Sequence, residues 1–371
     1  MAEETKKRKA DHVRIALKND IQARQVTTGF EDVHLIHRAL PEIDRKDVDL
    51  AVTVFGHEFA APMLVGAITG GTENGMKINA TIAEAVEELG LGMGVGSQRA
   101  AIEDRSVEDT YSVARTKAPN AFLVANIGAV QLAHGYGPKE AERAIEVLRA
   151  DALAVHLNAL QEAVQPEGQT DFKGILARVR ELAKSMKKPM IAKETGAGIG
   201  AEDAQLLEKV GIKGIDVSGA GGTSWAAVEY YRAEERRSIS QRRQGNVFWD
   251  WGIPTAASVV EVAQSVRIPT IASGGLRTGM DMAKAIALGA SLVSLSQPVL
   301  EAAVRGPEAT KRLLSILTDE LRTAMFLVGA GTIADLRKKP VVITGRTGEW
   351  LRARGFAIEE YVRRGSGGQA T

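Results

Sequence analysis

The sequence predicts an α/β fold in which eight consecutive strand–helix units close into a (β/α)8 TIM barrel. From Pro62 onward, short apolar strands alternate with amphipathic helices over about 250 residues, the usual size of such a barrel. The strands are uninterrupted apolar runs, as in parallel sheets that are covered on both faces. Two late strands, within residues 271–277 and 290–297, end in small and polar residues. In barrels of this kind the loops after the last two strands commonly bind a phosphate.

The amino-acid composition excludes several classes of protein and of functional site. The chain has 371 residues, 44% hydrophobic and 25% charged, which is typical of a globular protein with a sizeable core. A net charge of +1 gives no global attraction to nucleic acid or acidic membranes. The absence of cysteine excludes disulfides, cysteine metal sites and thiol nucleophiles. No apolar signal region and no run of roughly 18 apolar residues is present, so we expect a cytoplasmic enzyme without a membrane span.

Residues 1–61 are expected to form an N-terminal arm and a lead-in strand. The arm is basic over residues 6–9, and on its own this pattern favours a solvated helix start or a frayed end. It also fits a basic clamp over an anionic substrate, whereas a nucleic-acid arm would need a matching basic face elsewhere. Residues 21–60 indicate irregular structure, except that residues 47–55 alternate like an exposed strand before a turn at Gly56 and His57.

The barrel units follow in order, and residues 62–335 are assigned to them. The expected strands are residues 63–68, 91–95, 122–125, 152–155, 189–192 and 214–217, and the strands within 271–277 and 290–297. The expected helices cover residues 76–89, 106–117, 138–149, 172–186 and 310–327, with others starting near 201, 255 and 278. Residues 336–371 remain as a C-terminal extension, which we expect to be a small helical cap with a disordered tail at 365–368.

One connection is much longer than the others. Between Thr223 and the helix near residue 255 lies a long loop after strand six, which contains three tryptophans and a charged middle. A long insertion at the catalytic end of a barrel is usually a lid or a subunit contact.

Polar residues recur where the strands end, which is where barrel enzymes place their chemistry. The strand-end set is Thr69, Ser97, Gln98, Arg99, Asn126, His156, Asn158, Gln161, Glu162, Lys193, Ser218, Thr223, Arg277 and Ser296. The residue types leave several roles open. Lys193 fits a Schiff base, a cation beside an electron-rich cofactor ring, or a partner of Glu194. Glu162 fits a Mg²⁺ ligand if the substrate is a diphosphate, because Mg²⁺ often binds one carboxylate together with substrate phosphates.

These residues, in unbroken order, resemble type 2 isopentenyl-diphosphate isomerases, the FMN-dependent enzymes that interconvert isopentenyl and dimethylallyl diphosphate. The resemblance spans residues 8 to about 300. It rests on Arg8, Lys9 and His12, on the segments at 69–71, 96–99 and 126, and most specifically on residues 156–162 and 216–225. It continues through residues 193–194, 251–255 and 273–277.

The resemblance implies a role for each matching residue. FMN would be bound by Ala67, Ile68, Thr69, Ser97, Asn126, Lys193, Ser218, Thr223, Gly275, Leu276, Arg277, Ser296 and Gln297. The substrate diphosphate would be bound by Arg8, Lys9, Ser97, Gln98, Arg99, His156, Asn158 and Gln161, with Mg²⁺ on Glu162. Lys193 and His156 would support catalysis, in which N5 of reduced FMN is the expected acid and base. The resemblance also implies NADPH as reductant, a place in isoprenoid biosynthesis and a homo-oligomer, either a tetramer or an octamer.

Three alternatives remain at this point. The nearest is an FMN-dependent TIM-barrel oxidoreductase, although a nucleotide dehydrogenase of this shape needs a cysteine that the chain lacks. The second is a Schiff-base aldolase on Lys193. The third is a non-catalytic scaffold that binds phosphate or nucleic acid through its basic arm, against which the balanced net charge argues.

Overall fold

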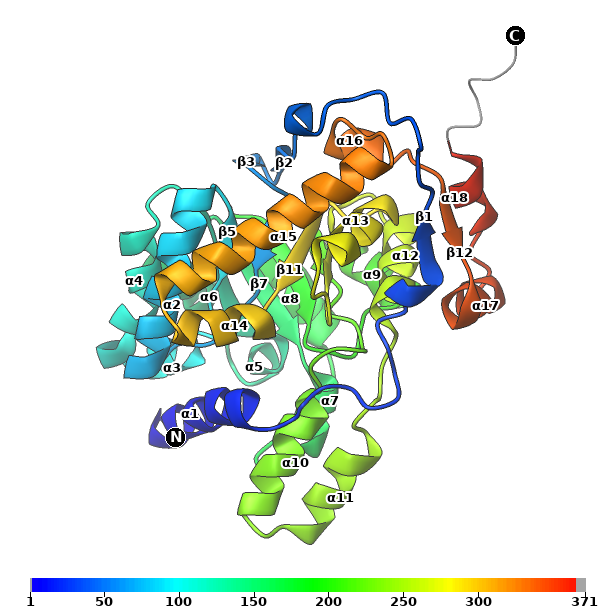
Figure 1. Cartoon of the computed structure of the whole chain (residues 1–371). Coiled ribbons are helices and arrows are strands. Elements are labelled where there is room, and N and C mark those ends of the chain that lie inside the picture. The colour runs from blue at the N-terminus through cyan, green and yellow to red at the C-terminus, as the bar shows by residue number, and fades with distance from the viewer. Residues whose placement is uncertain (1, 365–371) are drawn as a thin grey trace.

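The computed structural model describes residues 2–364 and contains a closed barrel of eight parallel strands. Their order around the barrel is β10-β11-β4-β5-β6-β7-β8-β9, so sequential strands are neighbours (Figure 1). The strands are β4 (Met63–Val65), β5 (Gly92–Gly94), β6 (Phe122–Gly128), β7 (Ala152–Leu157), β8 (Met190–Glu194), β9 (Gly214–Asp216), β10 (Thr270–Ser273) and β11 (Leu292–Leu295). The prediction of a (β/α)8 TIM barrel is confirmed.

Helices surround the barrel because each has one apolar face to bury. The outer helices are α2 (Glu73–Leu89), α4 (Asp109–Lys117), α6 (Pro138–Leu148), α8 (Ile175–Ser185), α9 (Ala201–Lys209), α12 (Thr255–Ser265), α13 (Gly279–Ala287) and α15 (Pro307–Leu327). In α2 the buried residues Ile78, Ile82 and Val86 recur at four-residue spacing. This helix begins where the Thr72 side chain accepts a hydrogen bond from the Gly75 amide.

Shorter helices stand where the strands end and carry site residues. They are α3 (Arg99–Glu103), α5 (Ala129–Ala133), α7 (Ala159–Val164) and α14 (Gln297–Val304). The N-terminal arm is also helical, as α1 (Ala2–Lys18). Figure 1 shows α1 and α7 at one end of the barrel and the hairpin of β2 (Val52–Val54) and β3 (His57–Phe59) at the other.

That hairpin closes the end of the barrel where the strands begin. Phe55 stacks on Phe122 at a ring distance of 5.8 Å, and Phe59 packs edge-on to Phe122 at 5.4 Å. The expected strand over 47–55 is present only as β2, and the expected turn at Gly56 and His57 is shifted by one residue. The turn lies at Phe55 and Gly56, both of which have positive φ as a tight hairpin turn requires, and His57 already belongs to β3.

The long connection after β9 is a helical hairpin, which corrects the prediction of a long loop. It consists of α10 (Trp225–Glu235) and α11 (Ile239–Val247) (Figure 1). The Ser224 side chain caps α10 by accepting the Ala227 amide hydrogen bond, and the hairpin packs through Ala227, Val228 and Trp249 against Ile15 and Ile21. The many exposed charged residues of this hairpin leave few apolar residues at helical spacing, so its sequence does not show the periodicity of an amphipathic helix.

The C-terminal extension is not purely helical, which is a second correction. Besides α16 (Ile333–Leu336), α17 (Gly345–Ala353) and α18 (Glu359–Arg363), it contains β12 (Val341–Ile343). This strand pairs antiparallel with β1 (Val33–Leu35) of the lead-in segment. The two flanking segments are therefore joined by backbone hydrogen bonds. The predicted disordered tail at 365–368 lies outside the described residues.

Replacing Phe59 by alanine is expected to lower the free energy of unfolding by about 3–5 kcal/mol, since a fully buried ring would leave a cavity in the closed end of the barrel. Urea denaturation followed by circular dichroism measures this change. Leu40→Ala is the control, because Leu40 is 70% exposed and its truncation should cost less than about 0.5 kcal/mol. Equal losses in the two variants would contradict the packing role of Phe59.

Candidate functional site

A cavity of about 240 Å³ lies where the barrel strands end, and it gathers almost the whole predicted site. Among the residues that line it are Arg8, Lys9, Ala67, Ile68, Thr69, Ser97, Arg99, Asn126, His156, Asn158, Gln161, Glu162, Lys193, Ser218, Thr223, Gly275, Leu276, Arg277, Ser296 and Gln297. They come from α1, from the C-terminal parts of strands such as β6, β7 and β8, and from the segments that follow the strands. Residues far apart in the sequence therefore share one cavity because parallel strands end on the same side.

Gln98 is the exception among the predicted site residues. Its side chain is fully buried and does not line the cavity. Its Nε2 donates to the Ala144 carbonyl oxygen at 2.9 Å, and its Oε1 accepts from the Asn126 amide at 3.0 Å. The side chain turns toward the barrel wall because these buried backbone groups need partners. The Gln98 side chain therefore does not face the cavity, and it bonds the Asn126 amide instead, so substrate binding by Gln98 stays a prediction that this placement does not support.

Lys193 pairs with a carboxylate that the sequence reasoning did not single out. Its Nζ lies 3.4 Å from Asp216 Oδ2 and donates to the Glu194 backbone oxygen at 3.0 Å. Asp216 Oδ1 accepts a short hydrogen bond from Ser273. The Glu194 carboxylate instead accepts the Thr195 and Gly196 amide hydrogen bonds at 2.6 Å, and burial raises its pKa to about 7. The ammonium is thus held at the cavity floor by Asp216.

His156 lies beside Lys193 and is held by Asn126. Its Nδ1 is 2.8 Å from Asn126 Oδ1, while the Asn126 Nδ2 donates to the Val95 oxygen at 3.1 Å. Burial and then the charge of Lys193 lower the pKa of His156 to about 4, so the ring is neutral near pH 7. Because Asn126 Oδ1 is the acceptor, the proton of the neutral ring lies on Nδ1, and Nε2 is a hydrogen-bond acceptor.

The residues from α1 and α3 make one side of the cavity cationic. Lys9 Nζ donates to the Ser97 backbone oxygen at 2.6 Å and to the Tyr111 hydroxyl at 2.9 Å. Burial and the charge of Arg8 lower the pKa of Lys9 to about 7. Burial and the charge of Arg99 likewise lower the pKa of Arg8. Such mutual repulsion would be relieved by a bound anion, so this side favours a phosphate group.

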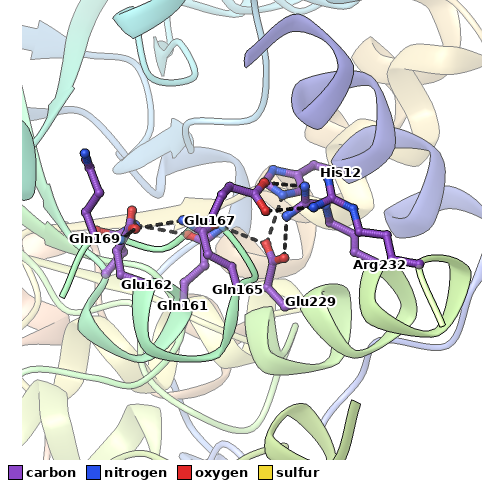
Figure 2. A network of polar contacts seen from close by, with 10 residues as sticks. His12, Gln161, Glu162, Gln165, Glu167, Gln169, Glu229 and Arg232 are labelled. Atoms are coloured by element: carbon purple, nitrogen blue, oxygen red, sulfur yellow. Dashed lines mark hydrogen bonds and ion pairs between the residues drawn. The ribbon is translucent and has the colours of Figure 1, made fainter. Parts of the chain in front are cut away.

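Glu162 belongs to a network of carboxylates and amides, drawn in Figure 2. Its Oε1 accepts from Asn158 Nδ2 at 3.0 Å, and its Oε2 accepts from Gln165 Nε2 and the Gln169 amide, both at 2.7 Å. Within residues 2–364 no group of three or more His, Cys, Asp or Glu side chains is arranged to hold a metal ion. A cation at Glu162 would therefore need further oxygen ligands from a bound substrate.

The second half of this network was missed from the sequence. Glu229 Oε1 lies 3.0 Å from His12 Nε2, and Arg232 Nη1 donates to Glu229 Oε2 at 2.5 Å (Figure 2). Arg232 Nη2 also bonds Glu167, and Gln161 Nε2 donates to Glu229 Oε1 at 3.4 Å. Glu229 and Arg232 are one turn apart on α10, so recognising this segment as a helix would have revealed the pair.

Two buried polar atoms on the cavity wall have no hydrogen-bond partner, namely Thr69 Oγ1 and Asn158 Oδ1. Buried polar groups in native proteins are nearly always satisfied, so each indicates a polar ligand group in the cavity. A hydroxyl or amide of a cofactor suits such atoms. Thr69, together with the ammonium of Lys193 and the guanidinium of Arg277, fits an anionic, hydroxyl-bearing cofactor such as FMN.

Glycines shape the loops after β9 and β10. A Cβ on Gly274 would lie 2.2 Å from the Gly219 oxygen, and a Cβ on Gly222 would lie 2.4 Å from Gly275. Gly274 and Gly275 also have positive φ. The amides of Arg277 and Thr278 are taken by the Asp281 carboxylate. An anion at this end would thus rely on the Arg277 side chain and on earlier loop amides.

Comparison with known proteins gives a consistent result. Residues 1–123 and 158–343 match the family of FMN-dependent dehydrogenases. The isopentenyl-diphosphate delta-isomerase of Methanosarcina mazei is 51% identical over 360 residues, which cover 97% of this chain and 98% of that protein. The enzyme of the same name from Methanothermobacter thermautotrophicus is 50% identical over 357 residues, 96% of this chain and 99% of that protein.

A solved structure of a flavocytochrome b2 variant superposes with a TM-score of 0.67 at 19% identity, over 93% of this chain and 84% of that chain. This likeness supports the barrel fold alone. Within residues 2–364, no helix combines the length and the apolar composition needed to cross a membrane.

Lowering the pH is expected to destabilise the fold through His156. Its pKa falls from 6.5 to about 4 on folding, so between these values the unfolded chain binds a proton that the folded chain does not. The stability that is present above pH 6.5, the pKa of the unfolded state, is therefore lost as the pH falls toward about 4, the pKa of the folded state. Urea titrations at about pH 7 and about pH 4.5 should show a smaller loss for His156→Asn than for wild type. The same loss in both would contradict the buried neutral ring, and His37→Asn, at an exposed histidine, is the control.

Proposed function

Since this chain belongs to the FMN-dependent, type 2 isopentenyl-diphosphate delta-isomerase family, we propose that it interconverts isopentenyl and dimethylallyl diphosphate by moving a proton across the allylic system with no net redox change. The observation that carries the proposal is a single cavity with two separate cationic regions. Arg8, Lys9 and Arg99 form one region, and Arg277 forms the other. Arg99 follows β5 and Arg277 follows β10, and the strands β11 and β4 lie between these two in the barrel. Two phosphate-bearing molecules side by side require such an arrangement.

In this proposal FMN is bound along the strand ends from β4 to β11. Arg277, Gly275, Leu276, Ser296 and Gln297 would hold its phosphate. Its ribityl chain and ring would contact Ala67, Ile68, Thr69, Ser97, Asn126, Lys193, Ser218 and Thr223. When bound and reduced, FMN supplies an electron-rich ring and an acid–base nitrogen, which the side chains around the cavity do not provide. The ammonium of Lys193, held by Asp216, places a fixed positive charge at the cavity floor, where it would stabilise an anionic reduced ring.

The substrate diphosphate would be bound on the other side by Arg8, Lys9, Arg99, Ser97, His156, Asn158 and Gln161. Asn158 already donates its Nδ2 to Glu162, and its unpartnered Oδ1 can only accept, so in this proposal a diphosphate oxygen would take its hydrogen bond from Nδ2. Near pH 7 the neutral His156 adds no charge, and an anion beside it would favour its protonation. Glu162 would hold Mg²⁺ together with the diphosphate oxygens, because no further carboxylate, histidine or cysteine among the described residues completes a metal site.

Three wider properties belong to the same proposal. NADPH would reduce FMN, and the enzyme would act in isoprenoid biosynthesis in the cytoplasm. The chain would form a homo-oligomer, a tetramer or an octamer. The exposed apolar side chains of Ile239, Val247 and Trp251, which are 82%, 64% and 62% exposed on and after α11, support a contact between copies there.

Purified enzyme with FMN and Mg²⁺ is expected to isomerise isopentenyl diphosphate only after the flavin is reduced, for example by dithionite. Because the reaction has no net redox change, one reduction should support many turnovers. Product formation and NADPH absorbance are followed together. Oxidation of one NADPH per product molecule would contradict the proposal and favour an FMN-dependent oxidoreductase, and trapping of Lys193 by borohydride would favour an aldolase.

Replacing Glu162 by glutamine is expected to raise the Mg²⁺ concentration for half-maximal activity at least 10-fold, since loss of the charged ligand weakens metal binding more than loss of an outer partner does. Isomerase assays across a Mg²⁺ titration measure this shift, and FMN binding should stay as in wild type. Glu181→Gln, the same change at an exposed position on α8, is the matched control. An unchanged Mg²⁺ dependence in Glu162→Gln would remove Glu162 from the metal site.

A further inference from the structure

The chain that follows α1 crosses the cavity end of the barrel as a backbone-bonded segment, residues 20–25. The Ala23 amide donates to the Gly222 oxygen at 2.8 Å, and the Ser224 amide donates to the Ile21 oxygen at 2.8 Å. Gln22 forms an isolated bridge with Thr223, and its backbone oxygen accepts from Trp249 Nε1 at 2.9 Å. These contacts fix the backbone of Gln22 above the glycine-rich loops, so its side chain has a defined direction.

The Gln22 side chain meets Arg277. Its Oε1 accepts a hydrogen bond from Arg277 Nη2 at 2.8 Å. The same nitrogen donates to Gln297 Oε1 at 3.1 Å, and Nη1 donates to the Leu276 backbone oxygen at 2.9 Å. All three acceptors are neutral oxygens. Among the described residues, no carboxylate lies within the 4.0 Å of an ion pair with Arg277. The guanidinium is therefore oriented but not neutralised.

The Asp281 carboxylate bonds the Arg277 backbone amide and not its guanidinium, and Glu301 reaches the guanidinium only through Gln297. Gln297 Nε2 donates to Glu301 Oε1 at 2.5 Å, and Gln22 Nε2 donates to Gln297 Oε1 at 3.3 Å. The two glutamines thus occupy the places beside Arg277 in which a glutamate would form a salt bridge. Burial lowers the pKa of Arg277, and the charges of Glu301 and Asp281 offset this only in part without forming an ion pair, so a bound anion would relieve the remaining cost. Neutral amides here preserve the charge for a ligand.

We propose that Gln22 is a positioning residue for the FMN phosphate: its neutral amide fixes the Arg277 guanidinium without forming an ion pair with it, which leaves the guanidinium available to pair with the phosphate. The inference rests on the proposed function, in which this end of the cavity holds the phosphate of FMN. Gln22 acts through Arg277 and is not itself among the residues that line the cavity. It lies in the same segment that leads from the substrate-side helix α1.

The decisive variant is Gln22→Glu, because it separates this role from a merely structural one. Glutamate keeps the shape and the acceptor, and it would pair with Arg277, so the flavin-free protein should be as thermostable as wild type or more so. The same pair would neutralise Arg277, and the dissociation constant of FMN should rise at least 10-fold. Riboflavin, which lacks the phosphate, is the internal probe, and its dissociation constant should change less than threefold. Quenching of flavin fluorescence measures both constants.

Two further variants complete the test. Gln22→Ala removes the acceptor without adding charge, so the FMN constant should rise by a smaller factor, about threefold, again without a change for riboflavin. Gln25→Ala is the matched control, since Gln25 is an exposed glutamine in the same segment, and it should bind FMN as wild type does. If Gln22→Glu fails to fold, the FMN and riboflavin constants of Gln22→Ala decide.

Equal weakening of FMN and riboflavin, or a fall in thermostability that matches the loss of FMN, would show a structural bridge and overturn the inference. Unchanged FMN binding in Gln22→Glu, with wild type binding FMN tightly, would overturn it as well. That result would leave the proposed function intact, because it concerns Gln22 alone. Failure of wild type to bind FMN at all would instead overturn the proposed function, and this inference with it.

Discussion

The register of three neighbouring strands fixes the charge on which the site depends. His156 of β7 is the ladder partner of Lys193 in β8, and Lys193 is the partner of Asp216 in β9. Partners across parallel strands face the same side, so the ammonium stands between a neutral imidazole and a carboxylate. A slip of one residue would turn each of these side chains to the opposite face of the barrel. The closed barrel prevents that slip because every strand is held on both edges.

The cationic side of the cavity depends on a different kind of interaction, since its residues come partly from outside the barrel. Arg8 and Lys9 belong to α1, which is attached to α10 through the pair of His12 with Glu229 and the pair of Arg14 with Glu235. Glu229 is fully buried, and Arg232 supplies its counter-charge. Breaking a buried pair by removing one partner typically costs about 3–5 kcal/mol, so the cluster strongly defines how α10 sits.

Sequence patterns predicted the parts of this molecule that follow from local rules. Short apolar strands between amphipathic helices gave the barrel, and the position of polar residues just after each strand placed nearly all of them around one cavity. Gln98 does not line the cavity, because a position after a strand does not determine the direction of the side chain. Its neighbours Ser97 and Arg99 line the cavity, whereas its own side chain satisfies buried backbone groups.

Other residues were missed because their roles arise only from long-range contacts. Asp216 lies inside a strand, and its role depends on its ion pair with Lys193. Lys193 is 23 positions earlier in the sequence but directly adjacent in the sheet. Glu229 and Arg232 lie in a charged stretch whose helical order depends on packing against α1. Gln22 stands in an irregular segment, and no local pattern relates it to Arg277. Tertiary contacts of this kind carry no periodic signal in the sequence.

The two sides of the cavity therefore differ in which parts of the chain build them. The floor and the Arg277 end are formed by the barrel, with Gln22 held to it by backbone hydrogen bonds. The opposite side needs the side chains of α1, which extends from that same segment. Contacts that fix residues 20–25 to the glycine-rich loops thus also limit where α1 can lie. Residues 20–25 contact the Arg277 end and also connect to the helix that carries Arg8 and Lys9.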